Sequence, residues 1–208
     1  LNNLIPWEGD CTNRPWSYQI TAVVPVIDTV EELKVCVELL QLQTIQPFII
    51  IVDTGSTEAN YKEIEKLRSE DIEVHSIRLN GVLHPSDLPA MAMDLGFSLC
   101  RSDYLFATHS DCFLRRINLL EDMLDSCLNK SPVVGYEITK RMHKDWEGMV
   151  SHTCSMYHMK TMDKIATCFE AAGNEGTESG GSISMMLLMQ QQMSQQQQMK
   201  QFQSMQQL

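Results

Sequence analysis

The sequence has no long apolar run and few basic residues. No stretch among its 208 residues reaches the roughly 20 consecutive apolar residues that a membrane-spanning helix needs, so we expect no transmembrane segment. Lysine and arginine number 16 against 27 aspartate and glutamate residues, which gives a formal charge of −11. A nucleic-acid groove needs clustered cations, so we expect no nucleic-acid partner. A small anionic ligand stays compatible, because a bound cation can supply the local positive charge.

Several well-known motifs are also missing. The apolar run at 20–25 is not followed by G-x-G-x-x-G, which argues against a classical dinucleotide fold. The sequence also has no phosphate-binding G-x-x-x-x-G-K-[ST] loop and no G-x-S-x-G nucleophile turn, which argues against a P-loop enzyme and a serine hydrolase. The seven cysteines include no C-x-x-C pair, which predicts reduced, mostly buried thiols. The chain starts at Leu1 without a signal-peptide pattern, and the missing initiator methionine suggests a fragment or a processed start. We therefore expect a cytoplasmic protein.

Apolar runs and amphipathic segments alternate along the first two thirds of the chain. Periodicity and turn residues predict strands near 20–25, 48–52, 73–79, 104–107, 133–138 and 149–159, and helices from 29, over 58–69, from 86, over 119–128 and over 162–169. Thr29 followed by Glu32 fits a capping box at the first helix. The β-α-β-α-β-α-β order predicts an α/β domain with a mostly parallel central sheet flanked by helices.

Three carboxylate or imidazole side chains follow predicted parallel strands. Asp53 ends the second strand, and His109 and Asp111 follow the strand at 104–107. Ligands of open α/β sheets bind at the carboxyl ends of the strands, where these residues fall. If strand geometry continues past Ala107, His109 and Asp111 point to the same side and can share one divalent metal ion. The alternative is a strand end at which polar residues leave the core.

The ends of the chain differ from its middle. We divide it into an N-terminal extension (1–18), the α/β domain (19–170) and a C-terminal segment (171–208). That last segment is a Gly/Ser linker followed by a Gln/Met-rich tail, which its composition predicts to be disordered or weakly helical. Self-association through a tail helix is the alternative.

Five segments, in order and at suitable spacing, resemble family 2 glycosyltransferases of the GT-A fold. The segments are Val23-Val-Pro-Val26, Leu40-Gln-Leu-Gln-Thr44, Ile51-Val-Asp-Thr-Gly-Ser56, Ala92-Met-Asp-Leu-Gly96 and Phe106 to Cys112. They are similar to the family's first strand with its V-I-P start, its L-x-x-Q-T run, its V-D-D-G-S signature, its A-R-N-x-G run and its D-x-D motif. The resemblance covers about residues 19–169 and implies a GT-A-like fold.

The resemblance also implies an activity, a cofactor and site residues. The expected enzyme is an inverting hexosyltransferase-like transferase that moves a sugar from a nucleotide-diphosphate donor to a hydroxyl of a glycan or other acceptor, with Mn²⁺ or Mg²⁺. The resemblance implies that Pro25 and Val26 line the nucleotide pocket and that Asp53 accepts a hydrogen bond from the nucleotide base. Asp111 matches the metal-binding second Asp of D-x-D. His109 replaces the first Asp and can still coordinate the metal or contact the nucleotide.

Two departures from the family pattern leave alternatives open. Met93 stands where the family has an arginine, which removes one phosphate contact, and the catalytic base has no clear position. Glu178 is the candidate base, with a solvated loop residue as the alternative. His158 or His152 is a candidate third metal ligand, with a structural histidine as the alternative. The alternative functions are a non-catalytic relative that binds a nucleotide-sugar or glycan, and an interaction protein that uses its Gln/Met-rich tail.

Overall fold

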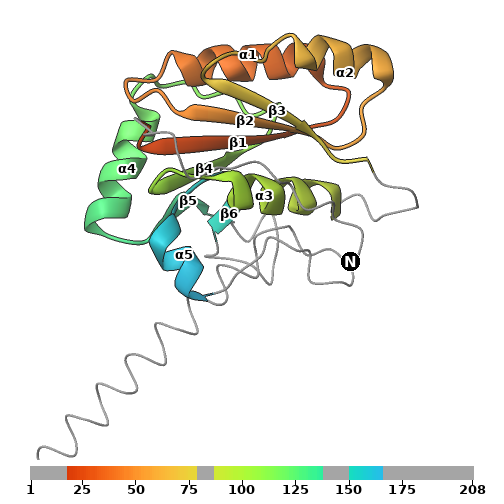
Figure 1. The fold of residues 1–208 in the computed structure, drawn as a ribbon. Coiled ribbons are helices and arrows are strands. Elements are labelled where there is room, and N and C mark those ends of the chain that lie inside the picture. Colours follow the sequence, from red (N-terminus) through yellow and green to blue (C-terminus); the bar gives the residue numbers. More distant parts are fainter. Residues whose placement is uncertain (1–17, 79–86, 138–149, 166–208) are drawn as a thin grey trace, which may run out of the picture.

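Residues 18–78, 87–137 and 150–165 of the computed structural model form a six-stranded sheet with helices on both faces (Figure 1). The sheet has the strand order β3-β2-β1-β4-β6-β5. The elements in chain order are β1 (Ile20–Val26), α1 (Val30–Gln41), β2 (Phe48–Asp53), α2 (Glu58–Glu65), β3 (Ile72–Ser76), α3 (Asp87–Leu99), β4 (Tyr104–Thr108), α4 (Leu119–Asn129), β5 (Val133–Glu137), β6 (Val150–His158) and α5 (Met159–Ile165).

The first four strands are parallel, and the last two are antiparallel additions. β1 pairs in parallel with β2 and β4, and β2 pairs in parallel with β3, whereas β6 runs antiparallel to both β4 and β5. Every residue of β1, β2 and β4 is buried. This burial explains why these strands are continuously apolar in the sequence, since a parallel strand is covered on both faces. The mostly parallel α/β fold predicted from the sequence is confirmed.

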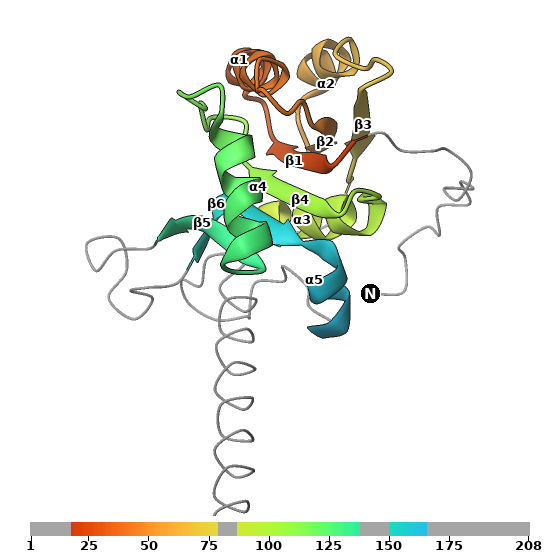
Figure 2. The same cartoon turned by 90° about the vertical axis from the view of Figure 1, so that its left-hand side faces the viewer.

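The two faces of the sheet carry separate hydrophobic clusters. Alternate residues of β1 divide between them: Ala22 and Val24 join the cluster formed with α1, α2 and α4, while Val23 joins the cluster formed with α3 and α5. Figure 1 shows α1 and α2 on one side of the sheet and α3 on the other, and Figure 2 shows α4 beside β5 and β6. The core therefore fixes the strand ends from both sides.

The elements differ from the sequence-based expectations in three places. β4 ends at Thr108, so strand geometry does not continue through the H-x-D motif. Thr29 occupies the N-cap position of α1, but its side chain makes no capping hydrogen bond, so the predicted capping box is wrong. The last described helix, α5, begins at Met159 rather than Met162. No helix within the described ranges is both long enough and apolar enough to span a membrane.

Candidate functional site

The carboxyl ends of β1 and β4 form the point at which the chain order of the sheet reverses. From β1 the chain proceeds to β2 and β3 on one side, whereas β4 lies on the other side of β1. Loops that leave two neighbouring parallel strands in opposite directions open a crevice, and this position is the usual ligand site of open α/β sheets. The loop after β1 and the turn after β4 therefore frame the candidate site.

The turn after β4 consists of residues 109–112. The Cys112 amide donates a hydrogen bond of 3.0 Å to the His109 carbonyl, which closes the turn, and the thiol of Cys36 in α1 lies 3.6 Å from the same carbonyl oxygen. The Asp111 side chain is exposed, whereas Nε2 of His109 is buried. The alternation expected for His109 and Asp111 is wrong, because a turn replaces the strand. Asp111 is the more exposed of the two, and His109 is partly exposed with its Nε2 atom buried.

A hydrogen bond joins the loop after β1 to the turn after β4. The hydroxyl groups of Thr29, after β1, and Ser110, after β4, lie 2.8 Å apart. This contact explains why Thr29 does not cap α1: its hydroxyl is directed to the neighbouring loop. The bond fixes the position of Ser110, and with it the exposed Asp111 beside it, relative to β1.

Asp28 ties the loop after β1 to the start of α2. It has a φ of +57°, a conformation that Asn and Asp adopt more readily than most residues. Its Oδ1 accepts hydrogen bonds of 2.8 Å from the Thr57 amide and from Nδ2 of Asn60. These donors stabilise the charged form and lower the pKa of Asp28 below its usual value, the Thr57 amide contributing most. The loops after β1, β2 and β4 are thus held together.

Asp53, at the end of β2, is fully buried and closely bonded. Its Oδ1 accepts the Ser56 amide at 3.0 Å, and its Oδ2 accepts the Ser76 hydroxyl at 3.2 Å. Arg78 completes the set, with Nη2 at 2.8 Å from Oδ2. An ionised carboxylate offers about four acceptor positions, so three donors leave one unused. Because Asp53 is fully buried, that position is closed to solvent in this structure.

Arg78 is the site residue that sequence reasoning missed. Besides its ion pair with Asp53, it donates to the Ser56 carbonyl at 2.8 Å and stacks over the Tyr61 ring with its Cζ atom 5.0 Å from the ring centroid. About half of the side chain is exposed. A single arginine after a strand is not part of any sequence motif. The sequence signal that could have identified it is its position just after β3, the strand that pairs with β2 and Asp53. It brings a cation to a region of a strongly acidic protein.

Three cysteines surround the turn after β4. The five described cysteines are reduced, as the sequence predicts. The interaction with the thiol of Cys154 in β6 lowers the pKa of the Cys112 thiol below its ordinary value and raises the pKa of Cys154. Burial raises the pKa of the third thiol, Cys36, to about 12, with a smaller contribution from Cys112. The turn that carries Asp111 is therefore bordered by thiols on its β6 side.

His158 lies at the far end of the sheet from Asp111. It is the register partner of Tyr104, the first residue of β4, so the length of β4, about 13 Å at ~3.3 Å per residue, separates it from the turn at 109–112. The geometry does not bring His158 to the metal candidate. Cys154 of β6 pairs with Thr108, the last residue of β4. The backbone of His152, two residues before Cys154 in β6, therefore lies at the same end of the sheet as Asp111.

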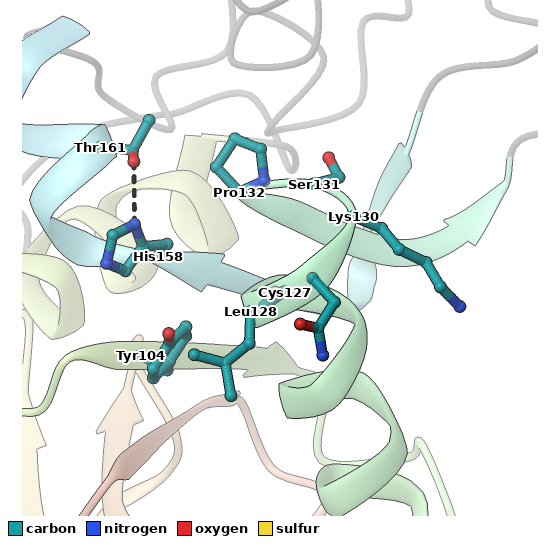
Figure 3. A pocket seen from close by; sticks show the side chains of 9 residues that line it. Tyr104, Cys127, Leu128, Lys130, Ser131, Pro132, His158 and Thr161 are labelled. Atoms are coloured by element: carbon teal, nitrogen blue, oxygen red, sulfur yellow. Dashed lines mark hydrogen bonds between the residues drawn. The ribbon is translucent and has the colours of Figure 1, made fainter.

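His158 instead borders a separate pocket of about 500 Å³ (Figure 3). Its Nδ1 lies 2.9 Å from the Thr161 hydroxyl, and its ring lies 5.3 Å from the Tyr104 ring, measured between centroids. The other lining residues come from the end of α4 and the segment before β5: Cys127, Leu128, Asn129, Lys130, Ser131 and Pro132. His158 is thus held by Thr161 and Tyr104 at this pocket, away from the turn at 109–112.

The remaining candidates are either buried or not described. Pro25 and Val26 are buried in β1, and the Val26 carbonyl accepts both the amide and the hydroxyl of Thr54. Met93 packs fully buried against the sheet. Glu178 lies outside the described residues. Within the ranges that the structure describes, no group of three or more His, Cys, Asp or Glu side chains is arranged to hold a metal ion.

Solved structures of glycosyltransferases share this fold. A mannosyltransferase from Pyrobaculum calidifontis, solved with GDP-Man and Mn²⁺, superposes with a TM-score of 0.57 at 10% identity, covering 76% of this chain and 52% of that one. TarS 1–349 from S. aureus gives a TM-score of 0.58 at 16% identity, covering 78% and 52%. The same protein with UDP-GlcNAc gives 0.56 at 16% identity, covering 73% and 48%. The chain thus spans about half the length of these structures and shares their GT-A-like fold.

The sequence comparisons agree with the fold. No curated protein sequence matches the chain. The sequence pattern described as glycosyl transferase family 2 matches residues 21–181, which includes β1 from Thr21 onward, the switch point between β1 and β4, and the turn that carries Asp111. Because this match extends over most of the sequence, the chain belongs to glycosyl transferase family 2.

Proposed function

We propose that this chain carries the donor-binding part of a metal-dependent glycosyltransferase, which moves a sugar from a nucleoside-diphosphate donor to an acceptor hydroxyl with inversion. The observation that carries the proposal is the Thr29–Ser110 bond of 2.8 Å, which holds exposed Asp111 at the mouth of the β1/β4 crevice. Family membership and the complexes of structurally similar proteins with GDP-Man or UDP-GlcNAc support the same reading.

The nucleoside occupies the side of the crevice formed by β1, β2 and β3. Arg78 and buried Asp53 border this side, and Tyr61 packs against Arg78. The half-exposed guanidinium can donate to a base or ribose oxygen while Asp53 holds its orientation. The carbonyl of Val26 is already bonded to Thr54, so Pro25 and Val26 would form the apolar floor rather than supply hydrogen bonds.

The residues at the turn after β4 fit a Mg²⁺ or Mn²⁺ ion that arrives with the donor. Mg²⁺ in phosphoryl-ligand sites takes one or two protein carboxylates, the phosphate oxygens and several waters, so one exposed carboxylate satisfies the protein's share. Asp111 supplies that carboxylate, and His109 and His152 are further candidates on the same edge. A divalent ion held there would neutralise the charge that develops on the leaving nucleoside diphosphate.

The acceptor side requires a carboxylate that removes the proton from the attacking hydroxyl, opposite the leaving group. Glu178 is our candidate for this base, with a glycan or another hydroxyl compound as acceptor. The buried position of Met93 gives a physical reason for the missing arginine: the side chain contributes to the core between α3 and the sheet rather than to a phosphate contact. If the protein binds the donor but transfers no sugar, the alternative of a non-catalytic donor-binding protein is favoured.

Thermal unfolding with UDP, GDP or ADP, each with and without Mn²⁺, tests the donor site. We expect one diphosphate to raise the midpoint by several degrees only when Mn²⁺ is present. Asp111→Asn should abolish this increase, whereas Asp125→Asn, which changes an exposed carboxylate on α4, should preserve it. No stabilisation by any diphosphate would contradict the proposal.

A second assay separates an enzyme from a binder. Release of the diphosphate from UDP-GlcNAc or GDP-mannose, with and without added glycan acceptors, measures hydrolysis and transfer. We expect Glu178→Gln to reduce transfer while leaving the diphosphate-dependent thermal shift unchanged. Stabilisation by a diphosphate without transfer to any acceptor would favour the non-catalytic alternative.

A further inference from the structure

Two thiols meet beside the turn that carries Asp111. Cys154 is on β6 and is the register partner of Thr108, the last residue of β4, while Cys112 closes the turn that follows Thr108 through its amide bond to His109. The antiparallel pairing thus places the end of the turn next to Cys154. This is a cross-strand dithiol built by strand register, distant in sequence but adjacent in space.

The pair is more accessible than the third thiol nearby. Cys112 and Cys154 are both partly buried at the edge of the sheet. Cys36 has no exposed surface, and its thiol is directed to the His109 carbonyl at 3.6 Å. Oxidation of a thiol requires access to the oxidant, so Cys112 and Cys154 are the pair that reacts, and Cys36 is the protected neighbour.

We propose that Cys112 and Cys154 form a reversible disulfide when the protein meets a hydroperoxide. One thiol attacks the peroxide oxygen; the O–O bond breaks, and a sulfenic acid forms as an alcohol, or water from hydrogen peroxide, departs. The second thiol attacks the sulfenic sulfur, the S–S bond forms and water leaves. In total two thiols are oxidised and one hydroperoxide is reduced. A small dithiol reverses the reaction by exchange.

The disulfide changes the position of the turn. It brings the two sulfur atoms to about 2 Å, the length of an S–S bond. Because β6 lies on the side of β4 opposite β1, this movement pulls residues 109–112 away from the crevice and from Thr29. This expectation rests on the proposed function: oxidation should weaken Mn²⁺-dependent diphosphate binding about tenfold, the lower end of the loss caused by removing a group that orients a metal ligand.

Peptide mapping tests the pairing directly. Each described cysteine near the turn lies in a different tryptic peptide: Cys112 in 102–115, Cys154 in 145–160 and Cys36 in 35–62. After brief treatment of the full chain with hydrogen peroxide and blocking of remaining thiols, we expect a linked species of peptides 102–115 and 145–160 that dithiothreitol separates. Absence of this species, or linkage of peptide 35–62 to either one, overturns the proposal.

Single cysteine-to-serine variants show which cysteines form the disulfide. Cys112→Ser and Cys154→Ser should each eliminate the linked species, whereas Cys127→Ser should retain it, since Cys127 lies in α4 with its thiol directed to the Met156 carbonyl. Persistence of the linked species in Cys154→Ser would show a different pairing. Reduced Cys154→Ser should bind diphosphate and Mn²⁺ like the unaltered chain and should lose only the response to peroxide.

Two readouts separate this proposal from the proposed function. Hydrogen exchange of the peptide 102–115 should slow on oxidation, because the disulfide restrains the turn; this measurement needs no nucleotide. The thermal shift by UDP or GDP with Mn²⁺ should fall in the oxidised protein and recover with dithiothreitol. If no diphosphate stabilises even the reduced protein, the proposed function fails while the mapping still decides the disulfide. If the disulfide forms and the shift is unchanged, the effect on binding is overturned.

Discussion

Arg78 covers the carboxylate of Asp53, with Nη2 of the arginine 2.8 Å from Oδ2 of the aspartate. The aspartate is fully buried, whereas 46% of the arginine side chain is exposed. The pair therefore joins the interior of the sheet to the surface of the candidate nucleotide site. A ligand that approached the end of β2 would therefore meet the arginine before the aspartate.

Replacing Arg78 with methionine should reduce both stability and nucleotide binding. The apolar stem is retained, but the buried carboxylate keeps only the Ser56 amide and the Ser76 hydroxyl as donors. Because water can replace part of an exposed guanidinium, we expect the free energy of unfolding to fall by about 1–2 kcal/mol. We also expect the Mn²⁺-dependent thermal shift by UDP or GDP to disappear, as measured by thermal unfolding with each diphosphate.

Arg68→Met provides the matched control for Arg78→Met. Its side chain has a similar exposure, 47%, and pairs with Glu65 while donating to the Val74 carbonyl of β3, away from Asp53. We expect a stability loss without a change in the diphosphate shift. Equal loss of the shift in both variants would indicate a general effect of unfolding and would contradict a role for Arg78 in recognition.

Removal of the Ser110 hydroxyl should loosen the turn after β4. Ser110→Ala breaks the bond of 2.8 Å with Thr29, which costs about 1 kcal/mol of unfolding free energy. The same bond positions Ser110, the residue before Asp111. We therefore expect the affinity for the diphosphate in the presence of Mn²⁺ to fall by more than the loss of folded protein accounts for. Urea denaturation and calorimetric titration with UDP or GDP and Mn²⁺ measure the two effects.

The other end of the same strand pair offers a control of the same chemistry. Thr21 in β1 and Ser102 before β4 also have hydroxyl groups 2.8 Å apart, with the same separation in sequence. Ser102→Ala should cost a similar unfolding free energy and leave binding unchanged, since this bond lies away from the carboxyl edge. The role assigned to Ser110 is wrong if the two variants bind equally well.

The sheet could be predicted from the sequence because its central strands are continuous apolar runs. The turn at 109–112 could not, since the period-two argument assumes that strand geometry continues, and only the backbone bond between Cys112 and His109 reveals the turn. The place of His158 depended on the antiparallel register of β6, which no local pattern encodes. Arg78 could not be predicted as a site residue, because only its ion pair with buried Asp53 distinguishes it from other exposed arginines.

The pH dependence of stability should report the bonds of Asp28. Its pKa lies below the usual value near 3.8, chiefly because the Thr57 amide bonds the charged form. A depressed pKa in the folded state adds stability above the pKa of the unfolded state, and this stability is lost as pH falls through the folded value. Asp28→Asn keeps an acceptor oxygen and tolerates the positive φ, so it removes mainly the charge.

We therefore expect Asp28→Asn to be less stable than the unaltered chain at neutral pH and to approach its stability below about pH 4. Urea denaturation at several pH values measures the difference. A difference that stays constant with pH would show that the charge of Asp28 contributes nothing and that the effect of the substitution comes from the loop backbone.

Packing of α3 on β1 requires the absence of a side chain at residue 96. A Cβ atom added to Gly96 would lie 2.3 Å from one γ-methyl of Val23 and 2.6 Å from the other. Val23 is fully buried in a central strand and β-branched, so its side chain cannot rotate away without displacing its neighbours. Gly96→Ala should lower the unfolding free energy by about 1–3 kcal/mol, even though alanine favours the helix.

Two further variants isolate the contact between Gly96 and Val23. Ser98→Ala, on the exposed side of α3, should have little effect on stability, because it leaves the packed face unchanged. With Val23→Ala already present, the two clashing γ-methyl groups are gone and the nearest atom is the Cβ of residue 23 at 3.0 Å. Gly96→Ala should then cost less than it does alone, by about 1 kcal/mol in a double-mutant cycle. Equal costs of Gly96→Ala in the two backgrounds would exclude the clash as the cause.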